Sequence, residues 1–171
     1  MKGDLSTLKK VCLYGSKVMT AGMAVIAAVI LILIALGIGS LFGGDVSAML
    51  DGMIGTSSED GTAVRMCSFL TIFTVFVLAF VTVKAVRDQM LSIRSEHSPF
   101  TEDNTRRLIV MSKIYIAGAV ILGILELANG HGAASAAFMF FGCILLSTVL
   151  YVFALMVRYG AVLQNESDHT L

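Results

Sequence analysis

Four long apolar stretches alternate with polar segments along the chain. They cover residues 18–41, 64–83, 109–128 and 133–157. A helix needs about 20 apolar residues to cross a hydrocarbon core about 30 Å thick, so each stretch is long enough to span a bilayer. The first and the fourth carry no charged residue, and the other two carry charges only near their ends. The pattern predicts an all-α integral membrane protein, a single domain whose four helices form a bundle.

The composition supports the same class. Hydrophobic residues make up 57% of the chain and charged residues 14%, against about 45–50% and about 25% in soluble domains. A soluble domain of this size could not bury that much apolar surface. The net charge is zero, which gives no reason to expect direct binding of nucleic acid.

The first stretch could also be read as a signal peptide. Basic residues precede it, and Val46-Ser47-Ala48 after it is a plausible cleavage site. The apolar part of a signal peptide is only about 7–15 residues long, however, and this stretch is longer. We therefore expect it to be retained as the first membrane helix.

The basic residues are distributed unevenly between the segments that join the stretches. They gather before the first stretch, in the segment 84–108, here called the elbow, and just after the fourth stretch; the outer loop 42–63 has none. Of the 12 Lys and Arg residues, only Arg65 lies toward the other side. Basic segments stay on the cytoplasmic side of a membrane. The charges predict a multi-pass protein of a prokaryotic plasma membrane, with the elbow, the N-terminus and the tail 158–171 in the cytoplasm.

Two segments outside the stretches have the spacing of amphipathic helices. Leu5, Leu8 and Cys12 share one helical face, which predicts a short helix lying on the inner leaflet; the alternative is a frayed basic terminus. Apolar residues also recur at helical spacing over 46–54, after a natural N-cap at Asp45. This second helix would rest on the outer interface or cover the end of the bundle.

The second stretch is expected to continue as a helix into the cytosol. Apolar residues recur on one face as far as Arg94, at Val83, Val86, Met90 and Ile93. Such a face must pack on something. Either the underside of the bundle or a separate protein would cover it.

The chain then turns back toward the membrane. Proline disfavours helix at the preceding residue, so Pro99 ends the extension. Thr101 can cap a new helix by accepting a hydrogen bond from a first-turn amide. Arg106 and Arg107 then anchor this helix at the lipid headgroups, and Phe100 suits packing against its first turns or in the interface.

The string SPFTEDNTRRL, residues 98–108, resembles the signature of the small prokaryotic membrane proteins catalogued as domain of unknown function 2975 (DUF2975). The matching residues are Pro99, Phe100, Thr101, Glu102, Asn104, Arg107 and Leu108. The resemblance implies four membrane helices and no established activity. Because members are often encoded beside a small helix-turn-helix regulator, it also implies a membrane-bound controller of a DNA-binding protein.

Two groups of residues in or beside the stretches are candidates for chemistry. Glu126 is the only acidic residue inside a stretch. With His131 across the following turn, it would form either a proton- or metal-responsive pair or a simple interfacial carboxylate beside a histidine. A zinc site needs at least three protein ligands, so we expect no metal and no cofactor. Cys12, Cys67 and Cys143 lie at different expected depths, which disfavours disulfides.

Small and hydroxyl side chains are the remaining intramembrane signals. Those on one face of the first stretch are Ala24, Ala28, Ala35, Gly39 and Gly43. We interpret this face as packing inside the bundle in preference to dimerisation. Those in the second stretch are Ser68, Thr71, Thr74 and Thr82. We expect hydrogen bonds from them to neighbouring helices.

The sequence contains no Gly-rich phosphate loop and no HExxH, CxxC or GxSxG motif, so we expect no enzyme. We predict a regulatory or scaffolding protein that engages a cytosolic partner through its basic inner face. The elbow residues assigned to that contact or to the turn itself are Arg94, Pro99, Phe100, Thr101, Asn104, Arg106 and Arg107. The alternatives are a small transporter or channel working as a homo-oligomer, and a structural subunit of a membrane complex.

Overall fold

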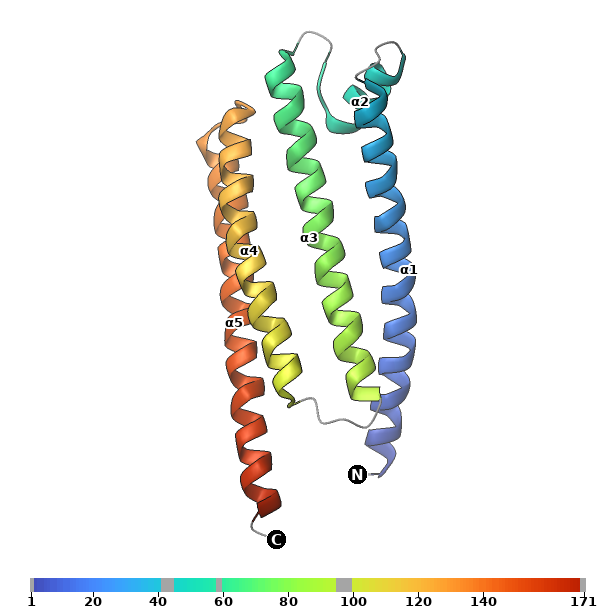
Figure 1. The fold of residues 1–171 in the computed structure, drawn as a ribbon, viewed down its shortest axis with the longest axis vertical. Coiled ribbons are helices and arrows are strands. Elements are labelled where there is room, and N and C mark those ends of the chain that lie inside the picture. The colour runs from blue at the N-terminus through green and yellow to red at the C-terminus, as the bar shows by residue number, and fades with distance from the viewer. Residues whose placement is uncertain (1, 41–44, 58–59, 95–99, 170–171) are drawn as a thin grey trace.

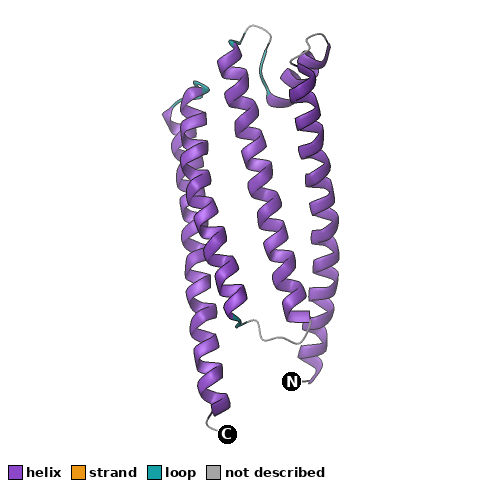
Figure 2. Ribbon diagram, in the orientation of Figure 1, coloured by secondary structure: helices purple, strands orange, loops and turns teal. Residues whose placement is uncertain are grey.

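The computed structural model describes residues 2–40, 45–57, 60–94 and 100–169. The described chain forms five helices and no strand (Figures 1 and 2). The helices are α1 (Lys2–Ser40), α2 (Asp45–Ile54), α3 (Thr62–Arg94), α4 (Glu102–Ala128) and α5 (Ala133–His169). All except α2 are long and apolar enough to cross a membrane. The predicted all-α class and the four candidate spans are therefore confirmed.

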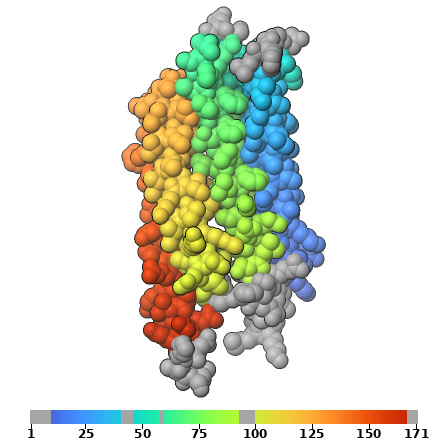
Figure 3. Space-filling view, in the orientation of Figure 1, coloured from blue at the N-terminus to red at the C-terminus, as the bar shows by residue number. Residues whose placement is uncertain are grey.

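The four long helices lie side by side in chain order. Helix α1 packs on α3, α3 on α4, and α4 on α5, while α2 contacts α1 and α3. Within the described residues no contact between α1 and α4 or α5 closes this arrangement. The predicted bundle is thus an open row, and α3 separates α1 from α4 along the face seen in Figure 3. Lipid is as apolar as the side chains, so in a bilayer helices need not close on one another.

The core of the row lies along α4, where it packs on α3 and on α5. Its buried residues are Leu78, Met111, Tyr115, Ala119, Leu122 and Cys143. Gly118 lets α3 approach closely, because a Cβ at that position would lie 2.9 Å from Cδ1 of Leu78. Tyr115 also bonds to Thr82, with 2.6 Å between the two hydroxyl oxygens. Helix α4 is therefore held on both sides and is the most buried of the four spans.

Three local predictions agree with the observed helices. Helix α2 begins at Asp45 and ends at Ile54. Its Leu50 and Ile54 are buried, whereas Met49 and Met53 are exposed. Helix α2 therefore covers the end of α1 and α3 that lies away from the start of α1 (Figure 1). This end of the row is called the outer end here, and the opposite end is called the inner end, as names only. Helix α3 runs to Arg94, as its apolar periodicity predicted.

Two other expectations need correction. The N-terminal segment is neither a separate surface helix nor frayed, because α1 runs unbroken from Lys2. The small-residue face of α1 does not pack inside the row: Ala24, Ala28 and Ala35 are exposed. Of its glycines, Gly39 meets Val46 of α2, and Gly43 lies outside the described residues.

Candidate functional site

The polar side chains considered as candidate sites lie at the two ends of the row. The inner end carries the elbow and both chain termini, and the outer end carries α2 and the turn between α4 and α5 (Figure 1). At the inner end, Thr101 caps α4 as predicted: its backbone is extended, with φ −111° and ψ 151°, and its hydroxyl accepts a hydrogen bond from the Asn104 amide. Glu102 and Asp103 occupy the first turn, where the helix dipole favours negative charge.

Asn104 joins α4 to α3. Its side chain is 4% exposed, and Nδ2 donates a hydrogen bond to Oγ of Ser92, with 3.5 Å between the two atoms. Asn104 is therefore an internal joint of the elbow and does not present its side chain to a partner. Ser92 was not predicted as its acceptor, because it lies 12 positions away on a different helix, α3. Pro99 and the side chain of Arg94 belong to the part of the chain that is not described.

Phe100 joins the elbow to α5. A Cβ added at Gly160 would overlap the Phe100 ring, so the ring rests directly on the α5 backbone. Only glycine at position 160 permits this approach. We expected Phe100 to pack on the first turns of its own helix or in the interface. The contact with Gly160 was not predicted, because Gly160 is far away in sequence.

Arg106 and Arg107 are both exposed, and they face different cavities. Arg107 lines an open cavity of 580 Å³ on the α3 side, with Asp88 and Ser92 among its neighbours. Arg106 lines an open cavity of 810 Å³ between α4 and α5, here called the inner cavity. Successive residues on a helix point in different directions. Arg107 therefore lies on the side of α4 that faces α3, and Arg106 lies on the side that faces α5.

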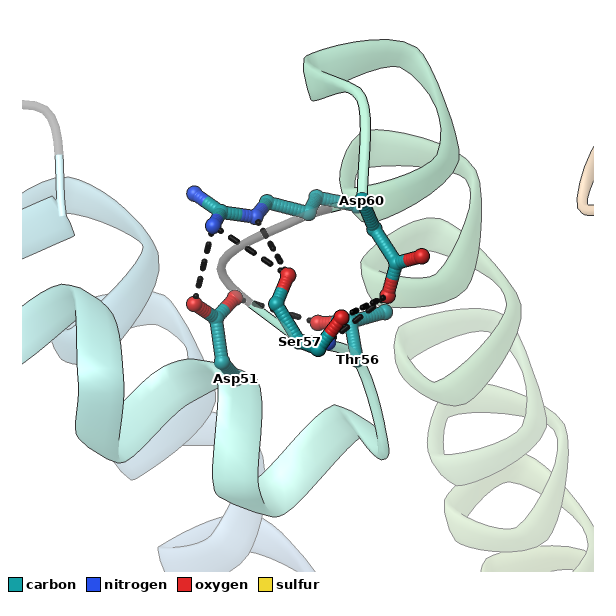
Figure 4. A network of polar contacts seen from close by, with 5 residues as sticks. Asp51, Thr56, Ser57 and Asp60 are labelled. Carbon is teal, nitrogen blue, oxygen red and sulfur yellow. Dashed lines mark hydrogen bonds and ion pairs between the residues drawn. The ribbon is translucent and has the colours of Figure 1, made fainter.

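At the outer end, Arg65 holds α2 against α3 (Figure 4). Its guanidinium lies 3.2 Å from Oδ2 of Asp51 and donates hydrogen bonds to the Ser57 carbonyl. The hydroxyl of Thr56 donates to Oδ1 of Asp51, at 3.0 Å. Asp51 is 8% exposed and lines a cleft of 540 Å³ between α1, α2 and α3. Arg65, the one basic residue that the sequence places at this end, thus forms an ion pair that holds two helices together.

The turn that follows α2 is also held by a carboxylate. Asp60 accepts hydrogen bonds from the backbone amide of Ser57, at 2.7 Å, and from its hydroxyl, at 3.0 Å. These hydrogen bonds, above all the one from the Ser57 backbone N–H, hold the pKa of Asp60 below its ordinary value. The lowered pKa means that the folded turn favours the ionised carboxylate. The stability that the ionised Asp60 adds to the fold is fully present above the ordinary pKa of an aspartate, and it is lost as the pH falls through the lowered pKa of Asp60.

Replacing Arg65 by alanine is expected to release α2 from α3. The Arg65–Asp51 pair is partly exposed, so its loss should cost about 1 kcal/mol. The change should appear as faster hydrogen exchange of backbone amides in residues 50–57, with that of α5 unchanged. Arg65→Lys keeps one charge and should exchange at an intermediate rate. Equal exchange in all three proteins would show that the ion pair does not hold the helix.

The predicted pair at the turn between α4 and α5 forms. Oε2 of Glu126 lies 3.1 Å from Nδ1 of His131 and accepts a hydrogen bond from the Ser135 hydroxyl at 3.0 Å. Glu126 is 5% exposed, whereas the side chain of His131 is 59% exposed. Ser135 was not predicted, because only the reversal of the chain brings α5 to Glu126. No group of three His, Cys, Asp or Glu side chains suited to a metal occurs in the described ranges.

One turn further along α4, Asn129 bonds to α3. Its Oδ1 accepts a hydrogen bond from the Ser68 hydroxyl at 3.3 Å, and its Nδ2 donates to Oγ1 of Thr71 at 3.4 Å. Asn129 is 7% exposed. The expectation that hydroxyls of the second stretch bond to a neighbouring helix or its cap is confirmed for Ser68, Thr71 and Thr82. Cys12, Cys67 and Cys143 are free thiols, as predicted.

Comparison of the chain with models of protein families, with curated proteins and with solved structures found no match. The resemblance of residues 98–108 to domain of unknown function 2975 stays a prediction. The geometry of the two ends of the row is therefore the basis for a functional assignment.

Proposed function

We propose that the protein is a non-enzymatic, multi-pass protein of a prokaryotic plasma membrane that regulates or holds a cytosolic partner through its elbow. One observation carries the proposal: the start of α4, in the described part of the elbow, is held by two other helices and presents exposed cations. Asn104 ties it to α3 and Phe100 ties it to α5. A surface whose backbone is already fixed loses less entropy when a partner binds.

The α3 side of the elbow is the proposed contact. Arg107 is exposed there, and within the described ranges it makes no ion pair. It lines the cavity on the α3 side together with Leu91 and Asp88. A partner that places a carboxylate against Arg107 would associate faster, and the charge pair would fix the orientation in which it binds. By the resemblance of residues 98–108, the proposed partner is a helix-turn-helix regulator.

The proposal requires the elbow to face the cytosol, which cysteine labelling tests. In a protein whose three native cysteines are replaced by alanine, one cysteine is introduced at Glu102 or at Met49, both exposed. We expect a membrane-impermeant thiol reagent to label Met49→Cys in intact cells and Glu102→Cys only after the membrane is opened. Labelling of Glu102→Cys in intact cells would reverse the topology and remove the proposal.

Charge reversal at Arg107 tests the contact itself. A photocrosslinker at Leu91, which lines the same cavity, should capture a helix-turn-helix protein in cells. Arg107→Glu should reduce that product about tenfold, the size of effect that a contact charge has on association. Lys17→Glu is the matched control, because Lys17 is an exposed cation toward the inner end of α1. An unchanged product in Arg107→Glu, or capture of no such protein, would refute the partner contact.

A further inference from the structure

Three cations converge on the inner cavity. Arg106 and Lys113 come from α4 and Arg158 comes from α5. All three are exposed, and the described part of the chain offers none of them an ion pair. Among the described residues that line the cavity, Glu102 is the only acidic one. The lining therefore has an excess of positive charge and is complementary to an anion.

The same cavity has an apolar wall. Phe100, Ile109, Val110, Ala161 and Val162 line it together with the cations. Val110 is 47% exposed and Val162 is 50% exposed, so apolar surface continues outward from the charged part. A ligand that fits both parts is anionic at one end and apolar at the other.

The cations are spread along the helix axis. Arg106 and Lys113 are about two turns apart on one side of α4, and both lie within the candidate span Glu102–Ala128. Arg158 lies within the candidate span Ala133–Glu166 of α5. Such an arrangement places positive charge between two membrane helices near the headgroups, where Lys113 can extend toward the interface.

We propose that the inner cavity binds an anionic phospholipid, with the headgroup phosphate between Arg106, Lys113 and Arg158 and an acyl chain along Val110 and Val162. Basic pockets between membrane helices on the cytoplasmic side suit such headgroups. The proposal depends on the membrane crossing that the proposed function assumes, and it does not depend on the cytosolic partner. Phe100, seated on Gly160, would connect lipid occupancy to the position of the elbow.

The test uses the full chain in phosphatidylcholine nanodiscs with a spin-labelled phosphatidylglycerol as the probe. We expect the labelled lipid to be immobilised by the protein and displaced by unlabelled phosphatidylglycerol or cardiolipin. Each cation contributes about 1 kcal/mol near a membrane surface, so Arg106→Gln and Arg158→Gln should each weaken retention about fivefold. The triple variant that includes Lys113→Gln should weaken it about hundredfold. Lys17→Gln is the matched control and should retain the lipid.

Two further results would overturn the proposal. Equal retention of phosphatidylcholine and phosphatidylglycerol would show that the cations do not select the headgroup. If inorganic phosphate displaced the spin-labelled lipid at the same concentration as unlabelled phosphatidylglycerol does, the cavity would be assigned to a soluble phosphate compound. The single variants at exposed positions keep the test valid if the triple variant fails to fold. Failure of lipid retention leaves the crosslinking at Leu91 unaffected, because Arg107 lines a different cavity.

Discussion

Replacing Gly118 by valine is expected to lower the free energy of unfolding by about 1–3 kcal/mol, the usual cost of overpacking a core. A Cβ at position 118 would already lie 2.9 Å from Cδ1 of Leu78, and valine adds two more methyl groups. Leu78 is 8% exposed and packs beside Ala119, which is fully buried, so it has little room to withdraw. Unfolding of the purified protein in mixed detergent micelles would measure the change.

The cause of this loss can be isolated with two further variants. Gly142→Val is the matched control, because nothing lies within 4 Å of a Cβ at that position of α5; its stability should be unchanged or higher. Shortening Leu78 to alanine should cost less in the Gly118→Val protein than in the native one, since contacting residues are not additive. Equal costs in both backgrounds would show that α3 and α4 do not approach through this pair.

The start of α4 and the bounds of α2 were predictable because local signals determine them. Thr101 has a hydroxyl where α4 needs an N-cap. Helix α2 follows from its own apolar spacing after Asp45. Capping and periodicity involve residues within a few positions of one another. A single sequence therefore suffices to place these elements.

The packing of the row was not predictable, because every long helix is apolar on all sides. In a membrane an apolar face can contact lipid as well as protein, so periodicity does not identify the buried face. Ala154 of α5 is fully buried, whereas Ala28 of α1 is exposed, although both are alanines within apolar stretches. The sequence predicted a four-helix bundle without its packing order, and the contacts show that the four helices form an open row.

The candidate sites were predicted in part for the same reason. Glu126 and His131 are close in sequence, so their pairing across a turn could be anticipated. Ser92 at the elbow, Gly160 against Phe100 and Ser135 beside Glu126 come from other helices. Only the packing of helices places them, and none has a residue type that marks it in the sequence.

Helix α4 connects the two ends of the row. Its N-terminus forms the elbow through Thr101 and Asn104, and its outer end bonds to α3 and α5 through Asn129 and Glu126. One continuous helix of 27 residues joins these contacts. The contacts of Glu126 belong to the outer end of this helix, and their removal tests what holds the turn between α4 and α5.

Replacing Glu126 by alanine is expected to lower the free energy of unfolding by about 1–3 kcal/mol. Ser135 would lose its acceptor, His131 would lose its partner, and a small space would remain at a position that is now 5% exposed. Glu126→Gln keeps a side-chain carbonyl that can accept from Ser135, so it should lose less stability than the alanine variant. His131→Ala should also lose less, because that side chain is 59% exposed.

The same variants separate a structural role from a transport role. The proposed function gives Glu126 no part in moving protons or solutes, so native and Glu126→Gln protein should give the same low proton flux in liposomes. A large flux in the native protein that the glutamine variant abolishes would favour the transporter alternative, since only the ionisable group differs between them. Equal stability of the alanine, glutamine and native proteins would show that Glu126 does not hold the turn to α5.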